Sequence, residues 1–321
     1  MNCTCVRYTE LPHTSNLFAD FTYHPEKVQS FYPHIDGNFE AIAGEIRFPA
    51  ERRASLVAAL RQENGDNPAL EQLALEGAVA VVTGQQVGLF SGPAYTIYKA
   101  LTAVKLARDL SARGIPAVPV FWLATEDHDF AEVDHCWVFD AEHHAIKLQK
   151  PHSPASSQPV GQFVVSAPPV AELRAALAGF PFGEEVSALV EETYQPGRTM
   201  GEAFSALLKR LLAQYGLLHV DPMAPALREL AAPALRSALA AAPDLTAAVL
   251  ERNRALEAAG YHAQVHVEDQ TSFVFLLENG RRFTLRRFGR DYLQNGRRFS
   301  TEELMDRATQ LSPNPSCRSI A

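Results

Sequence analysis

Residues Val79–His135 read VAVVTGQQVGLFSGPAYTIYKALTAVKLARDLSARGIPAVPVFWLATEDHDFAEVDH. The β-branched run at 79–82 and the apolar run at 117–124 have the composition of strands that are buried on both faces. Between them, 94–113 carries apolar residues at helical spacing, and a glycine and a proline then end the helix. Two strands joined by such a helix normally run parallel with a right-handed crossover. The stretch therefore predicts one βαβ unit in an α/β fold with a parallel sheet.

An unusual loop follows each of these two strands. The first, Thr83–Pro93, has glycines at every fourth position, and the second is the four-residue run Glu126–Asp129, with the sequence EDHD. Parallel strands end at the same edge of a sheet, where open α/β folds bind their ligands. We therefore expect both loops to face one cleft at this edge.

The glycine-rich loop has two explanations. It could present backbone N–H groups and the start of the next helix to an anion, or it could be a tight turn that only helps helix and strand to pack. It contains neither G-x-G-x-x-G nor a lysine directly after its last glycine. On the first explanation, the ligand contacts are Thr83, Gly84, Gln85, Gln86, Gly88, Gly92 and Lys99.

The acidic loop places three carboxylates and one imidazole in four residues. Clustered carboxylates repel one another, so they are usually kept for a metal ion, a cationic group or proton transfer. A solvated surface loop would have the same composition. On the functional reading, Asp127→Asn or His128→Ala should reduce activity, or ligand binding where turnover is absent, far more than stability, because such a loop contributes little core burial.

Two further candidate residues lie in the second half of the chain. Arg198 precedes a helix whose start carries a predicted capping box, and its guanidinium suits either a carboxylate or phosphate ligand or a structural ion pair. Asp221 follows the short apolar strand 216–220. If that strand is parallel to the first two, Asp221 lies in the same crevice.

The remaining patterns predict smaller units. Strands are expected at 136–140, 144–148, 161–166 and 261–268, together with a hairpin of strands 271–277 and 281–286. Seven arginines in 281–298 form either a solvated face of the hairpin or a positively charged rim of the site that attracts anions.

We divide the chain into five parts. They are an N-terminal arm with the first part of the core (1–135), an inserted connecting segment (136–183), a continuation of the core (184–240), a helix plus β-hairpin insertion (241–300) and the start of a C-terminal region (301–321).

Composition narrows the function. A net charge of −8 disfavours binding to nucleic acid or to an anionic membrane, and no segment has the length of a membrane span. Four scattered cysteines indicate a reducing compartment, so we expect a cytoplasmic protein. Neither the Cys3-x-Cys5 pair nor the histidines at 262 and 266 form a convincing metal site, and we assign no metal ligand.

The long motifs also carry a resemblance to a known family. TGQQVGLFSGPAYTIYKALTAVKLAR and VPVFWLATEDHDFAEVDH, followed in order by YQPGRTMGEAF, LLHVDP and AGYHAQVHVED, resemble the bacillithiol biosynthesis cysteine-adding enzymes, which are cysteine ligases. The resemblance covers nearly the whole chain. It implies a Rossmann-like core of nucleotidyltransferase type with inserted connecting segments, followed in the family by a coiled coil that lies beyond this sequence.

The resemblance implies ligation of cysteine to glucosaminyl-malate through a new amide bond. Such a reaction needs an activated carboxyl group, for which ATP is one candidate donor, although the sequence does not identify the donor. Gln85, Gln86 and Lys99 would then orient the donor, and His128 would act with Asp127 in catalysis as the base that frees the attacking amine. Glu126, Asp127 and Asp129 would hold a substrate ammonium group or a magnesium ion.

The absence of the coiled coil from this sequence leaves an alternative. The chain could be a truncated, non-catalytic homologue that retains a nucleotide- or sugar-binding core, or a half-enzyme that depends on a partner. A core cut at this point would expose an apolar face and unpaired strand edges. Self-association into a homo-oligomer is the expected consequence.

Overall fold

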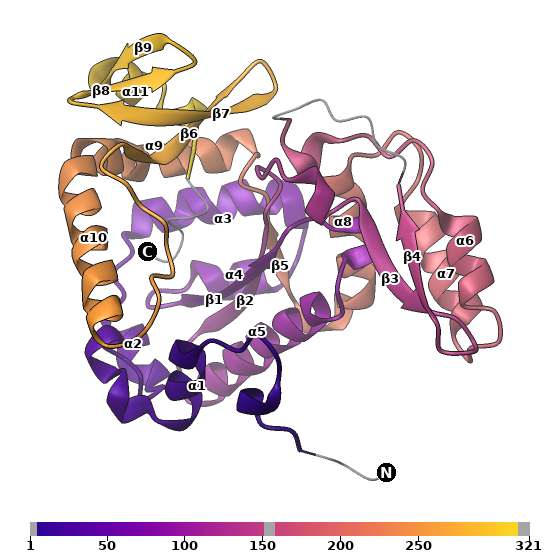
Figure 1. The fold of residues 1–321 in the computed structure, drawn as a ribbon. Coiled ribbons are helices and arrows are strands. Elements are labelled where there is room, and N and C mark those ends of the chain that lie inside the picture. Colours follow the sequence, from indigo (N-terminus) through magenta and orange to yellow (C-terminus); the bar gives the residue numbers. More distant parts are fainter. Residues whose placement is uncertain (1–4, 151–157, 314–321) are drawn as a thin grey trace.

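The computed structural model describes residues 5–150 and 158–313, which form three sheets with helices packed around them (Figure 1). Cys3, residues 151–157 and the last residues (314–321) lie outside the described residues. No helix within the described residues is long and apolar enough to cross a lipid bilayer.

The central sheet confirms the predicted βαβ unit. β1 (Val79–Gln85) pairs in parallel with β2 (Ala117–Leu123), and α5 (Tyr95–Ala112) connects them. β5 (Leu218–Val220) pairs in parallel with the other side of β2, so the strand order is β1-β2-β5. All three strands therefore end at the same edge, as predicted for β1 and β2, and the parallel pairing of β5 meets the condition set for Asp221.

Both faces of this sheet are covered by helices. On one face, Phe121 and Leu123 of β2 share a core cluster with residues of α5 and of α8 (Met200–Leu211). On the other face, Val118 and Val120 share a cluster with α3 (Ala50–Asn64) and α4 (Ala69–Ala74). The alternation along β2 is that of a strand buried on both sides, which explains its continuous apolar sequence.

A side lobe lies next to this core. β3 (His135–Phe139) and β4 (Ala145–Gln149) form the predicted antiparallel pair, and α6 (Val170–Ala176) and α7 (Gly183–Thr193) pack in the same lobe (Figure 1). The predicted strand at 161–166 is wrong. These residues form a 3-10 turn and one isolated bridge, because Gly161 packs directly against Thr125 and its N–H bonds to the Thr125 carbonyl oxygen at 2.9 Å.

The second large sheet is antiparallel, has the strand order β10-β6-β7-β8-β9 and lies over α9 (Pro225–Ala240) (Figure 1). Its strands are β6 (Thr271–Glu278), β7 (Arg281–Phe288), β8 (Asp291–Gln294), β9 (Arg297–Ser300) and β10 (Leu311–Pro313). The predicted hairpin of β6 and β7 is confirmed. The apolar side chains of this sheet and of α9 form one core cluster. Leu304 of α11 (Thr301–Asp306) and Leu311 of β10 belong to this cluster.

The N-terminal arm, with α1 (Asn16–Tyr23) and α2 (Phe39–Glu45), meets α10 (Ala242–Ala258). The predicted strand at 261–268 is wrong, because its apolar residues pack in two directions. Tyr261 packs into the cluster around the arm, while Val265 and Val267 pack with α10 and β6. This segment therefore covers a helix instead of joining a sheet.

Gly84 is required where β1 and β2 approach each other. A Cβ atom at this position would lie 2.7 Å from the Trp122 carbonyl oxygen and 2.9 Å from Trp122 Cβ. We expect Gly84→Ala to lower the free energy of unfolding by about 1–3 kcal/mol, measured by denaturant titration. Gly44→Ala is the matched control, because a Cβ on Gly44 in α2 would meet nothing within 4 Å, so this change should be neutral or stabilising. Equal effects would show that Gly84 is not a packing glycine.

A buried polar cluster joins β5 to α8 and α3. The His219 side chain is fully buried, and its Nδ1 lies 2.9 Å from Ser205 Oγ. Ser205 Oγ donates to Glu63 Oε1 at 3.1 Å, so this hydroxyl must accept a hydrogen bond from His219 Nδ1–H. Burial, assisted by the charge of Lys209, lowers the pKa of His219 to about 3. The folded protein therefore holds this imidazole neutral.

His219 should make stability depend on pH. Below about pH 6.5 the unfolded chain protonates this imidazole, whereas the folded chain resists protonation down to a pKa of about 3. The free energy of unfolding should fall as the pH falls through this window, by up to about 1.4 kcal/mol per pH unit from this group. His219→Gln should show a shallower pH dependence in thermal or urea unfolding. His266→Gln, which removes a histidine side chain that is 90% exposed, should not.

Candidate functional site

The carboxyl edge of the central sheet brings the two predicted loops together. Gln86 of the glycine loop donates from Nε2 to Asp127 Oδ2 of the acidic loop at 3.0 Å. The backbone N–H of Ala124 also bonds to the Gln85 carbonyl oxygen at 3.0 Å. The predicted meeting of the loops is therefore confirmed.

The loops nevertheless line two different hollows. A pocket of about 560 Å³ lies beside the glycine loop and is bordered by Gln85, Gln86, Tyr95, Glu132 and Trp137, among others. The acidic loop contributes Glu126 to a separate and mainly apolar cavity of about 320 Å³, which Trp122 and Arg228 also line. None of the residues 126–129 borders the pocket beside the glycine loop, so that pocket is not the shared cleft that the sequence predicted.

Asp127 is the centre of the contact between the loops. Its Oδ2 accepts from Gln86, which also donates from the same Nε2 to Glu132. Its Oδ1 accepts from the His128 backbone N–H at 2.8 Å and from Arg282 Nη1 at 3.2 Å. The Asp127 side chain is only 13% exposed. Its charge is therefore balanced inside the protein.

Arg282 is a site residue that the sequence did not single out. It lies on β7, its side chain is fully buried, and its guanidinium stacks 4.0 Å from the centre of the Phe275 ring. Besides Asp127, it contacts His128 Nδ1 at 3.3 Å and donates to the Pro313 carbonyl oxygen at 3.1 Å. No sequence pattern separates Arg282 from its exposed neighbour Arg281, so only the fold identifies it.

The other residues of the acidic loop face different surroundings. Glu126 is 1% exposed and lines the apolar cavity together with Arg228. Burial lowers the pKa of Arg228, although the negative charges of Glu126 and Asp221 act to raise it. Asp129 is exposed and makes no side-chain bond that caps the short turn after it. Within the described residues, the carboxylates of this loop do not converge on one point as metal ligands would.

Most N–H groups of the glycine loop already have partners within the protein. Those of Gly88, Leu89 and Gly92 bond to backbone carbonyl oxygens at 2.9 Å, and that of Ser91 reaches Tyr194 Oη at 3.4 Å. A Cβ on Gly88 would lie 3.0 Å from the Cα of Gly92, whose own φ is +65°. These glycines serve the turn itself, which corrects the expectation of a backbone cradle along the whole loop. At the start of α5, the N–H groups of Thr96 and Ile97 bond to the carbonyl oxygens of Pro93 and Ala94 at 2.9 and 3.1 Å, so only the N–H groups of Ala94 and Tyr95 remain for an anion.

The polar side chains beside the turn form a chain of contacts. Lys99 Nζ donates to Gln85 Oε1 at 3.1 Å, and Gln85 Nε2 donates to Tyr95 Oη at 3.4 Å. Burial lowers the pKa of Lys99. The predicted contact Thr83 lies within β1, opposite Phe121, so it is part of the strand and not of the loop.

The remaining two candidates have separate positions. Asp221 joins the edge as predicted, since its Oδ1 accepts from Thr125 Oγ1 and from the Met223 N–H at 2.9 Å, and burial raises its pKa. Arg198 donates to the Thr193 carbonyl oxygen at 3.1 Å and makes no ion pair with the described carboxylates. The capping box of Thr199 and Glu202 beside it is confirmed. Arg198 therefore holds a helix end in this structure.

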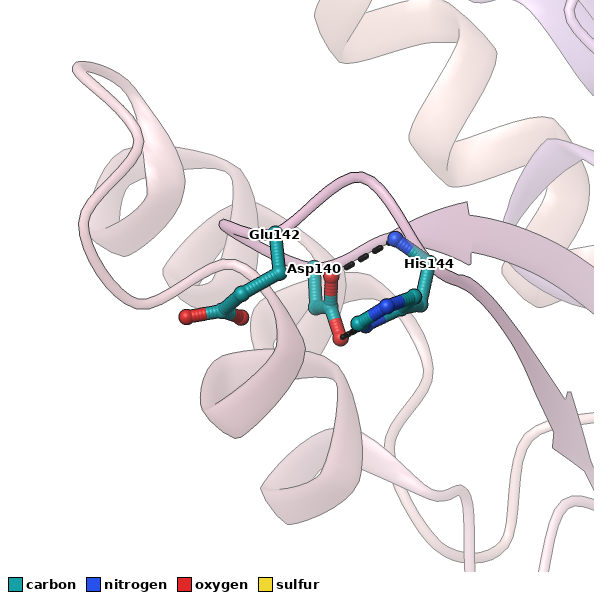
Figure 2. Close-up of side chains that lie close together, drawn as sticks. All are labelled: Asp140, Glu142 and His144. Carbon is teal, nitrogen blue, oxygen red and sulfur yellow. Dashed lines mark hydrogen bonds and ion pairs between the residues drawn. The ribbon is translucent and has the colours of Figure 1, made fainter.

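One group of potential metal ligands lies away from this edge, in the turn between β3 and β4 (Figure 2). Asp140, Glu142 and His144 each offer an atom within 4.8 Å of the others. Asp140, however, already accepts from the His144 N–H at 2.8 Å and contacts the His144 ring at 3.2 Å. These bonds close the turn, and the first of them is the main cause of the lowered pKa of Asp140.

A parallel sheet with crossover helices and polar loops at its carboxyl edge defines a Rossmann-like domain. Residues 1–320 match the family described as "Bacillithiol biosynthesis BshC, N-terminal Rossmann-like domain", and the chain belongs to this family.

Several bacterial relatives carry the name "Putative cysteine ligase BshC". The protein from Solibacter usitatus is 63% identical over 100% of this chain and 62% of its own length. Those from Koribacter versatilis and Heliobacterium modesticaldum are each 35% identical over 94% and 92% of this chain, and each is covered over 58%. The chain thus spans about three fifths of the length of these relatives.

The structure changes the expectation for Asp127. Asp127→Ala would leave the buried Arg282 without this carboxylate, so we expect the free energy of unfolding to fall by about 3 kcal/mol in urea titrations. Asp127→Asn keeps one acceptor oxygen and should cost less. The control is Asp129→Ala, which removes an exposed neighbouring carboxylate and should change stability by no more than about 0.5 kcal/mol. Equal stability of the Asp127→Ala and Asp129→Ala variants would contradict a structural role for the pair.

Proposed function

We propose that this domain takes part in joining cysteine to glucosaminyl-malate, as the N-terminal Rossmann-like part of a cysteine ligase. Family membership over residues 1–320 is the observation that carries this proposal. The polar loops that meet at the carboxyl edge support it, because ligands of open α/β sheets bind there. The relatives' name supports the reaction class, which is formation of an amide bond.

The pocket beside the glycine loop is the proposed place for the group that activates the carboxyl. Ala94 and Tyr95, at the start of α5, form part of the wall of this pocket, and the positive end of the helix dipole lies there. Gln85, held by Lys99, contributes a carboxamide to the same wall. An ATP phosphate is the ligand that we propose here, with Gln85 and Lys99 as its side-chain contacts. Gln86, whose Nε2 already donates to Asp127 and Glu132, supports the site from beside it.

Carboxylates near the pocket are the proposed contacts for a substrate ammonium group. Glu132 lines the pocket and is exposed, and the aromatic side chains of Tyr95 and Trp137 border the same space. A carboxylate beside aromatic faces suits an ammonium ion of cysteine or of an amino sugar. Asp129, three residues before Glu132, is also exposed and is a second proposed contact for the ammonium group. Glu126 and Asp127 are buried or nearly so, and they support the site from within the protein. We place the reaction in the cytoplasm, which agrees with the free thiols of Cys5 and Cys136.

A turnover assay tests the proposal. The chain is incubated with glucosaminyl-malate and cysteine, with and without ATP, and the amide product is detected by mass spectrometry. We expect product only when ATP is present. Failure to form the amide with ATP or with any other nucleoside triphosphate would contradict the proposal.

Lys99→Met tests the assignment of the pocket. The substitution removes the cation that holds Gln85, so we expect the rate of amide formation to fall by about 10²-fold, with folding judged by circular dichroism. Lys105→Met is the matched control, because Lys105 lies on the same helix and is exposed. Equal rates in the two variants would exclude this pocket as the reaction site.

A further inference from the structure

The two ring nitrogens of His128 have different surroundings. Nδ1 lies 3.3 Å from Arg282 Nη1 inside the protein. Nε2 makes no hydrogen bond to any residue in 5–150 or 158–313, and the side chain is 42% exposed. One nitrogen is thus engaged by the protein, and the other is available to a ligand.

The contact with Arg282 determines where the imidazole carries its proton. An arginine side chain in a protein is always protonated and can only donate. Nη1 has two N–H groups, and its two partners are Asp127 Oδ1 at 3.2 Å and His128 Nδ1 at 3.3 Å. A nitrogen that accepts a hydrogen bond bears no proton, so neutral His128 carries its proton on Nε2.

The opposite arrangement is disfavoured on two grounds. A proton on Nδ1 would need Asp127 Oδ1 as its acceptor, but these atoms are 3.6 Å apart, and Oδ1 already accepts from Arg282 and from the His128 backbone N–H. A proton on Nδ1 would also point at the guanidinium, which can only donate. Arg282 cannot easily move away, because Phe275 and Pro313 hold it in place.

We propose that His128 is a hydrogen-bond donor, through Nε2, to an anionic oxygen of a ligand, and that Arg282 is the positioning residue that fixes this role. The ligand group is a phosphate or a carboxylate oxygen. His128 therefore does not accept the proton of the attacking amine, which replaces the role expected from the sequence. The hydrogen bond from Arg282 withdraws electron density from the ring and makes Nε2–H a better donor. Only the identity of the anion rests on the proposed function, and the proton position does not.

Nitrogen-15 NMR tests the proton position without any turnover. In long-range ¹H–¹⁵N spectra, with His128 assigned from a His128→Gln sample, we expect Nδ1 to be unprotonated and Nε2 to be protonated. Arg282→Lys should reduce this preference, because a lysine cannot reach Asp127, His128 and Pro313 together. The signals of His262, on the surface, serve as the internal control. A proton on Nδ1 in the wild-type protein would overturn the proposal, and this readout remains decisive if the Arg282 variant does not fold.

Titration with inorganic phosphate and, separately, with malate identifies the anion. A shift of His128 Nε2–H with phosphate assigns the contact to the activating group, and a shift with malate assigns it to the carboxylates of the substrate. We expect His128→Gln, which keeps an N–H donor, to bind the effective anion within about threefold of wild type. His128→Leu should weaken binding by about tenfold. No shift with either anion, or equal binding by both variants, would overturn the donor role whether or not the chain forms the amide.

Discussion

The pairing of Arg282 with Asp127 connects the two large sheets of this protein. A fully buried guanidinium is expensive to remove from water, so it requires a carboxylate and further acceptors around it. Asp127 supplies the carboxylate from the acidic loop of the parallel sheet, and Pro313 supplies a carbonyl oxygen from β10 of the antiparallel sheet. The loop therefore has a fixed shape only when the antiparallel sheet is in place. The requirement to satisfy one buried charge orders the whole candidate site.

As a consequence, the four adjacent residues of the acidic loop have different surroundings. Glu126 turns into an apolar cavity, Asp127 turns into the protein, and His128 and Asp129 face outward. A dense run of charge in the sequence therefore does not produce a dense cluster of charge in space. Its net effect is to hold the imidazole of His128 against Arg282 in one orientation.

Local patterns in the sequence predicted the parts of the fold that depend on local physics. The strands around α5, the hairpin of β6 and β7 and the capping box at Thr199 follow from burial, turn geometry and capping, and all are confirmed. The Asn-Gly turn between β8 and β9, with φ values of +47° at Asn295 and +85° at Gly296, carried a similar signal that was missed. The alternation of apolar and polar residues at 261–268 gave a wrong prediction of a strand. Its apolar residues pack against two different clusters, one around the N-terminal arm and one around α10 and β6, and not against one face of a sheet. Arg282 and the occupied N–H groups of the glycine loop depend on contacts across the chain that no local pattern encodes.

The acidic loop also constrains the order in which this chain can assemble. β1, α5 and β2 are close in sequence and can pair early, because short loops close at little entropic cost. The loop after β2, in contrast, has its backbone tied to residues 160 and 161 and its carboxylate tied to a partner 155 residues away. In a growing chain, this edge of the sheet stays unfinished until β7 has been synthesised. We therefore expect the site to be among the last features to mature during folding, with the edge open to proteases or chaperones until then.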